Sequence, residues 1–149
     1  MNWEKVTRQK AELDALKPLP EALLRNLEEW LTVELTYTSN ALEGNTLTRQ
    51  ETALVLEKDI AIGGKSLREH YEAKNHAYAI GHVLEALMNK PALVEQDVLD
   101  LHGRILRTID DANAGRYRTI AVRIAGSGVI FPNPAKVSLA MTEFSNWLS

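Results

Sequence analysis

The stretch Ser39-Asn40-Ala41-Leu42-Glu43-Gly44-Asn45-Thr46-Leu47-Thr48 ends one helical pattern and leads into the next. Upstream of it, apolar residues recur at helical spacing from about residue 21 to 43, which predicts a long helix with one side against a core. Glycine adopts the left-handed conformation that closes helices, so Gly44 is its natural end. The apolar positions expected to face the core are Leu23, Leu24, Leu27, Trp30, Leu31 and Leu35.

The position of Glu43 is electrostatically unusual, because the carbonyl end of a helix carries partial negative charge and favours cations. An acid at this end therefore calls for a positive partner. Lys65, Arg116 and Arg118 are the candidates within the chain, and the sequence does not choose among them. A plain helix end is the alternative interpretation of the motif.

Further helices are expected on both sides of this stretch. Two capping boxes, a hydroxyl residue followed three positions later by glutamate, begin at Thr48 and Ser66 and predict helix starts there. Residues 119–124 and 128–131 are rich in β-branched side chains, and the three residues between them can turn the chain, which predicts a short β-hairpin. The fold class is therefore mainly α with one short β-hairpin, and the expected helices span about residues 2–16, 21–43, 48–58, 66–88, 95–107 and 137–148.

The composition is that of an ordinary globular domain. The chain has 149 residues, a formal net charge of −3 and no cysteine. This charge offers no basic footprint for nucleic acid, and no apolar run approaches the roughly 18 residues that span a membrane. The N-terminal residues lack the apolar core of a signal peptide. A cytoplasmic protein without nucleic-acid or membrane partners is the simplest expectation.

Several sequence features that resemble binding or catalytic motifs lack a residue or a spacing that such motifs require. Gly63-Gly64-Lys65-Ser66 resembles the end of a phosphate-binding loop, but Asp59 stands where that loop needs glycine. The histidines do not have the spacing of metal ligands on a helix, so no metal site is expected. Asp110 and Asp111 are interpreted as helix-end charges rather than as an acid–base pair.

An ordered series of motifs resembles the Fic family. Ser39-x-x-x-Glu43-Gly44 resembles the family's inhibitory motif, and its continuation to Thr48 resembles the class in which the inhibitory helix precedes the catalytic core. Gly64-Lys65-Ser66-Leu67-x-Glu69 resembles the next landmark. Gly115-Arg116-Tyr117-Arg118, with Val122-x-Ile124, resembles the strand pair called the flap. Phe131-Pro132-Asn133-Pro134-x-x-Val137 and the helix over 141–147 resemble the segment after the flap, so the resemblance covers about residues 30–149.

The resemblance implies a Fic-like helical bundle in which residues 1–45 include the inhibitory helix. Residues 46–149 would be the first part of the Fic core, with the flap at about 119–131. Such a protein transfers AMP from ATP, with Mg²⁺, to a Ser, Thr or Tyr hydroxyl of a target protein, and a homo-oligomer is left open. The implied regulatory residues are Ser39, Glu43 and Gly44, the nucleotide-binding ones Glu43 and Val122, and the target-docking ones Val122, Arg123, Ile124 and Ala125.

The family's catalytic signature, H-P-F-x-x-G-N-G-R-x-x-R, does not occur in the 149 residues. In the family the inhibitory glutamate pairs with the second arginine of this signature, and in some relatives it also positions a water that removes AMP. We therefore expect a truncated, self-inhibited adenylyltransferase that is inactive alone, has no catalytic residue and binds neither ATP nor Mg²⁺ tightly. The alternative hypothesis is a regulatory or binding module that supplies an inhibitory helix to a partner Fic enzyme.

Overall fold

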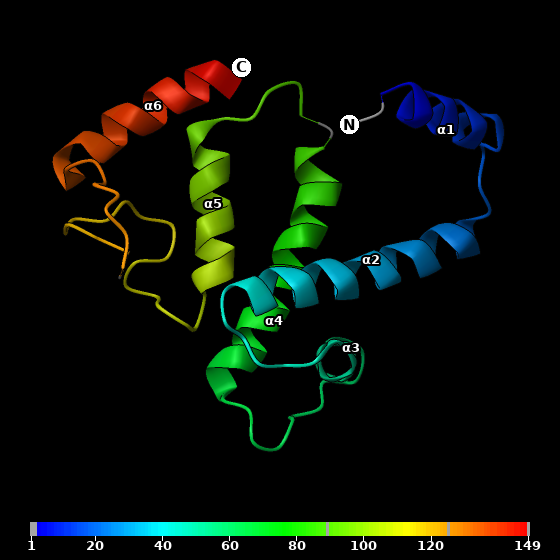
Figure 1. Cartoon of the computed structure of the whole chain (residues 1–149), viewed down its shortest axis with the longest axis horizontal. Helices are drawn as coiled ribbons and strands as arrows, with labels where there is room; N and C mark the ends of the chain where they lie inside the picture. The colour runs from blue at the N-terminus through cyan, green and yellow to red at the C-terminus, as the bar shows by residue number, and fades with distance from the viewer. Residues whose placement is uncertain (1–2, 89, 125, 149) are drawn as a thin grey trace. The chain divides into compact units, whose positions relative to one another are not determined.

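The computed structural model describes residues 3–88, 90–124 and 126–148, and they are mainly helical (Figure 1). The expected helices are found close to their predicted positions. The chain divides into two compact units between Thr32 and Val33, inside the second helix. The helices are α1 (Trp3–Ala15), α2 (Glu21–Leu42), α3 (Arg49–Lys58), α4 (Leu67–His82) with a π-helical turn (Val83–Leu87), α5 (Glu95–Leu106) and α6 (Val137–Leu148), which follows a 3₁₀ turn (Pro134–Lys136).

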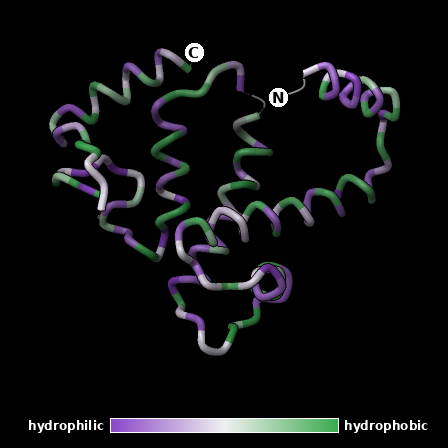
Figure 2. Tube along the Cα trace, in the orientation of Figure 1, coloured by the Kyte–Doolittle hydropathy of each residue, from purple (hydrophilic) through white to green (hydrophobic). Residues whose placement is uncertain are grey.

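The first unit contains α1 and the beginning of α2, and its described residues bury none of their side chains. Hydrophobic and hydrophilic residues alternate along both helices (Figure 2). The prediction that the apolar row of α2 faces a core is wrong for the large residues, since Leu23 is 52% and Trp30 51% exposed. Periodicity specifies that a helix has an apolar side, but a core also needs a second apolar layer to cover that side.

The core of the second unit lies where α3 and α4 meet. Leu47, Val55 and Ala73 form one buried cluster, and Ile62 packs against it. Helix α4 packs against both α3 and α5, and α5 also contacts α6. The loop after α2 therefore contributes a core residue, Leu47, only four positions beyond Glu43.

Helix α2 ends in a Schellman motif, the arrangement in which two amides after the helix bond back to its last carbonyls. The Gly44 amide donates to the Ala41 carbonyl at 3.1 Å, and the Asn45 amide donates to the Asn40 carbonyl at 3.0 Å. Gly44 has φ +92°, in the left-handed region that glycine adopts without strain. This motif makes Glu43 the C-cap residue of α2, as the sequence predicts.

The predicted hairpin is not confirmed. Among described residues, 119–124 and 126–131 contain no strand, and their backbone contact is a turn in which the Ser127 amide donates to the Ile124 carbonyl at 3.1 Å. Their large side chains are exposed, Ile130 by 94%. A two-stranded hairpin is marginal without an apolar face to pack on a core, which explains the irregular backbone. Ala125 lies outside the described residues.

Candidate functional site

The three predicted regulatory residues lie together at the end of α2. Ser39 is half-buried in the last turn, whereas Glu43 and Gly44 are exposed at the C-cap. Within the described part of the chain, the Glu43 carboxylate makes no ion pair and no hydrogen bond. The amide nitrogen Nδ2 of Asn40, in the same turn, is buried without a hydrogen-bond partner there. The end of α2 thus presents an acid at the negative pole of a helix, and no described residue supplies a cation paired with it.

The cations considered as partners of Glu43 are used elsewhere or are not paired with it. Lys65 donates from Nζ to the Thr46 carbonyl at 2.5 Å. Arg118 donates to the carbonyls of Ile120 and Pro132, at 2.9 and 2.5 Å. No ion pair joins Arg116 to Glu43 in the described residues. None of these three cations is therefore paired with Glu43 in the described part of the chain.

Asn45 attaches the end of α2 to α4. Its Nδ2 donates to the Glu69 carbonyl and to Oε2 of Glu72, both at 3.0 Å. Its Oδ1 accepts from the Leu47 amide at 3.0 Å, which makes an Asx turn. None of these contacts was predicted from the sequence. An asparagine after a helix-closing glycine is a turn signal that could have revealed the Asx turn, but not the bonds to α4.

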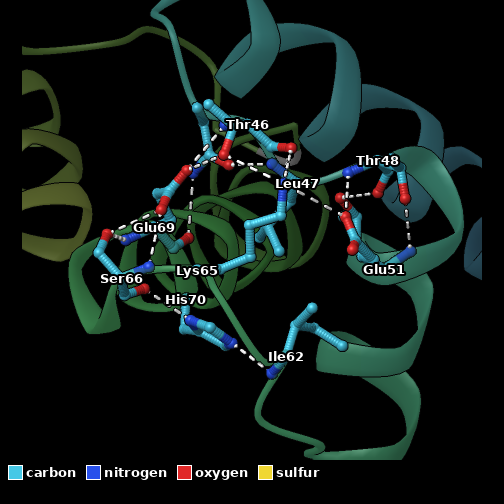
Figure 3. A network of polar contacts seen from close by, with 11 residues as sticks. Thr46, Leu47, Thr48, Glu51, Ile62, Lys65, Ser66, Glu69 and His70 are labelled. Carbon is cyan, nitrogen blue, oxygen red and sulfur yellow. Dashed lines mark hydrogen bonds and ion pairs between the residues drawn. The ribbon is translucent and has the colours of Figure 1, made fainter.

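Glu69 is the centre of a polar network between this loop and the start of α4 (Figure 3). Its Oε1 accepts from the Thr46 amide at 2.9 Å and from the Thr46 hydroxyl at 2.6 Å. Its Oε2 accepts from the Ser66 amide and hydroxyl, both at 2.8 Å. The Thr46 hydroxyl bond, followed by the Ser66 and Thr46 backbone bonds, lowers the pKa of Glu69 to about 2.

The predicted capping boxes at Thr48 and Ser66 are both present. They are also linked to each other. Lys65 lies between them, with Nζ 3.1 Å from the Thr46 hydroxyl and 3.7 Å from Oε2 of Glu51 (Figure 3). The lysine that superficially suggested a phosphate-binding loop is therefore bonded to oxygen atoms of the protein.

Two histidines have structural roles beside this network. His76 Nδ1 lies 3.1 Å from the hydroxyl of Thr36, which is fully buried in α2, and burial lowers the pKa of His76. His70 accepts the Ile62 amide on Nε2 at 2.8 Å and contacts the Ser66 carbonyl through Nδ1 at 2.7 Å. Both rings thus join α4 to neighbouring segments of the chain.

The predicted docking residues Val122, Arg123 and Ile124 are exposed. A cavity of about 370 Å³ lies in this segment. No hydrogen bond or ion pair between described residues joins them to Glu43, so the structure does not bring the two predicted sites into direct contact. The cavity is lined by Ala121, Val122, Arg123, Ser127, Gly128, Val129, Ile130 and Phe131.

A second polar cluster, which was not predicted from the sequence, joins α5, α6 and the segment between them. The Tyr117 hydroxyl donates to Oε1 of Glu95 at 2.5 Å, and the Thr142 hydroxyl donates to Oε2 at 3.2 Å. Desolvation and the bond to Glu95 raise the pKa of Tyr117 to about 12. Because the residues of this cluster are far apart in the sequence, no local sequence pattern predicts their contacts.

The described residues contain no cluster of metal-binding side chains. No group of three or more His, Cys, Asp or Glu side chains is gathered there in a way that could hold a metal ion. Among these same residues, no helix is long and apolar enough to cross a membrane.

Comparisons with known proteins place this geometry in a family. No protein-family model matches the chain. The chain is 33% identical over 138 residues to the protein adenylyltransferase Fic of Drosophila grimshawi, covering 91% of this chain and 28% of that protein. It is 30% identical over 148 residues to the enzyme of the same name from Culex quinquefasciatus, covering 99% of this chain and 29% of that protein.

Solved structures give the same result. Fic-1 of C. elegans matches with a TM-score of 0.80 and 30% identity, over 97% of this chain and 42% of that chain. A Fic domain-containing signaling protein of Bacteroides thetaiotaomicron matches with a TM-score of 0.83 and 27% identity, over 95% and 55%. The chain spans less than a third of the length of the two curated relatives. It belongs to the Fic family.

Proposed function

We propose that these residues form the regulatory front part of a self-inhibited protein adenylyltransferase, with Glu43 as the inhibitory acid. The observation that carries the proposal is the exposed Glu43 carboxylate at the C-cap of α2, without a cation in the described part of the chain. The curated relatives are named protein adenylyltransferases, which supports AMP transfer as the reaction of the whole protein.

The physical basis of inhibition is a competition for one arginine. Arginine forms strong, often bidentate hydrogen bonds with either a carboxylate or a phosphate. The family resemblance supplies that arginine as the second arginine of the catalytic signature, which is absent from the 149 residues. Paired with Glu43, it is unavailable to the γ-phosphate of ATP. The acid at the negative end of a helix gains from such a pair, because the arginine offsets an unfavourable charge.

The segment 119–131 is the proposed docking element for the target. Its described residues 119–124 and 126–130 are exposed and form no strand, which leaves their amides and carbonyls available to an extended target segment that can add as a strand. In this proposal Val122, Arg123, Ile124 and Ala125 contact the target, and Val122 also contacts the adenine. The acceptor is a Ser, Thr or Tyr hydroxyl of the target protein.

The first experiment tests the 149-residue chain alone. Incubated with α-labelled ATP, Mg²⁺ and a cell lysate, the purified chain labels no protein, because the general base and the phosphate-binding residues belong to the absent signature. Strong labelling that tracks with the purified chain would refute this part of the proposal.

The second experiment tests Glu43 in a protein that carries both these residues and the signature. Glu43→Gly increases self-labelling, whereas Glu29→Gly, an exposed acid of the same helix, leaves it unchanged. An unchanged rate in Glu43→Gly would remove the inhibitory assignment.

A regulatory module that acts on a separate Fic enzyme is the second candidate function, and the same exposed acid supports it. This hypothesis predicts that the 149-residue chain co-purifies with a Fic core and lowers its labelling rate, and that Glu43→Gly abolishes the inhibition without abolishing binding. Failure to bind such a core favours the first proposal.

A further inference from the structure

Each carboxylate oxygen of Glu69 accepts two hydrogen bonds. Its oxygens accept four hydrogen bonds, two from Thr46 and two from Ser66, at 2.6 to 2.9 Å. Two of these donors belong to the capping box of α4, which explains why a glutamate follows Ser66 at this spacing. The two bonds to Thr46 are not part of any cap, because Thr46 lies in the loop after α2, 23 positions earlier in the sequence.

The bonds to Thr46 act on the position of Glu43. From Glu43 onward the chain is fixed at Gly44 by the Schellman motif, at Asn45 by α4, at Thr46 by Glu69 and at Leu47 by burial in the core. Lys65 adds a further bond to the Thr46 carbonyl. Gly44 is thus fixed to the end of α2, and the next three residues are held against α4 or the core, so the C-cap of α2 cannot shift relative to α4 without breaking one of these contacts.

We propose that Glu69 is a positioning residue for the inhibitory acid: through Thr46 it holds the end of α2 against α4 and so sets where Glu43 is presented. The inference rests on the proposed function for its regulatory meaning, but its structural content concerns this chain alone. Loosening the Thr46–Glu69 contact weakens inhibition even though Glu43 itself is unchanged.

Glu69→Gln is the sharpest perturbation, since it keeps the shape of the side chain. A glutamine offers one carbonyl and one NH₂ group, whereas both oxygens of Glu69 face N–H and O–H donors. At least one of the two backbone amides, that of Thr46 or that of Ser66, therefore loses its acceptor, whereas a hydroxyl can turn and accept from the NH₂ group. Thr46→Val is the second variant: at an exposed position it removes the hydroxyl that donates to Glu69 and accepts from Lys65, and it leaves the cap of α4 intact.

Asp97→Asn is the matched control. Asp97 is the acid at the corresponding position of α5, where it accepts from the Val94 amide at 2.9 Å and from Lys90 at 2.5 Å. Among the described residues, no hydrogen bond or ion pair joins it to Thr46 or to α2. The control therefore removes a carboxylate from a helix start without loosening the loop after α2.

The structural arm is amide hydrogen exchange on the 149-residue chain. Glu69→Gln and Thr46→Val raise exchange at the amides of Gly44, Asn45, Thr46 and Leu47 by about tenfold, through local opening, and Asp97→Asn leaves these amides unchanged. Unchanged exchange in both variants, or an equal rise in the control, would overturn the positioning role.

The regulatory arm is self-labelling of the protein that carries the signature. Glu69→Gln and Thr46→Val raise the rate toward that of Glu43→Gly, and neither adds to the rate when combined with Glu43→Gly. If Glu43→Gly raises labelling but the two loop variants do not, the positioning inference fails and the proposed function stands. If Glu43→Gly itself has no effect, the proposed function fails, and the exchange data still decide whether Glu69 holds the loop.

Discussion

Gly44→Ala isolates the backbone geometry that presents Glu43. Gly44 has φ +92°, and a Cβ placed on it would meet no atom within 4 Å, so the substitution introduces strain without a clash. The left-handed backbone costs an L-residue about 1–2 kcal/mol. We expect the free energy of unfolding of the second unit to fall by about this amount relative to a control that carries the same Gly→Ala change without strain.

Gly63→Ala is that control. Gly63 also has open space around its Cβ position, and its φ lies outside the left-handed region. Both substitutions stiffen the unfolded chain equally, an effect of about 0.4–1 kcal/mol, so this effect cancels in the difference between them. Urea unfolding followed by circular dichroism measures both variants. Equal stability of Gly44→Ala and Gly63→Ala would show that α2 does not end in the left-handed turn, and the placement of Glu43 would lose its basis.

The remaining predictions concern the contacts around this helix end. Leu47→Ala, which removes a 4%-exposed core side chain, lowers the free energy of unfolding by about 2–5 kcal/mol, and calorimetry or urea unfolding measures the loss. Stability also depends on pH through Glu69: its pKa falls from 4.5 unfolded to about 2 folded, so its contribution is present above pH 4.5 and is lost as the pH falls toward 2. Acid titration of Glu69→Gln shows a weaker decline across that interval than the unchanged chain. Burial lowers the pKa of His76 from 6.5, so stability also declines as the pH falls below 6.5, and His76→Gln removes that part of the decline.

The sequence predicts the local features of this molecule well. Helix starts at Thr48 and Ser66 and the stop at Gly44 follow from capping chemistry, which involves residues within one turn of each other. Glu43 was singled out because an acid at the end of α2 conflicts with the helix dipole. Such conflicts between local rules are detectable without any knowledge of the tertiary structure.

Features that depend on distant residues were not predictable in the same way. Asn45 and Thr46 form hydrogen bonds with Glu69, which lies more than 20 positions further along the chain. Glu95 accepts hydrogen bonds from both Tyr117 and Thr142, and Thr142 lies 47 positions after it. The hairpin was predicted from the many β-branched residues of segment 119–131. Such residues favour strands when a sheet surface is available to pack them, but their presence does not create that surface. The prediction that the apolar row of α2 is buried was wrong for the same reason. The helical period of these residues was clear, but the sequence of α2 does not specify a second apolar layer that would cover them.

The most direct test of the account compares the AMP-transfer rates of Glu43→Gln and Glu43→Gly in the protein that carries the catalytic signature. Glutamine keeps the length of the side chain and removes only its charge, so it isolates the electrostatic part of the proposal. If the charge of Glu43 inhibits the enzyme, both variants exceed the rate of the unchanged protein by at least about tenfold, which corresponds to a lost interaction of about 1.4 kcal/mol. A Glu43→Gln rate equal to that of the unchanged protein would contradict the account, because the carboxylate charge would then play no part in inhibition.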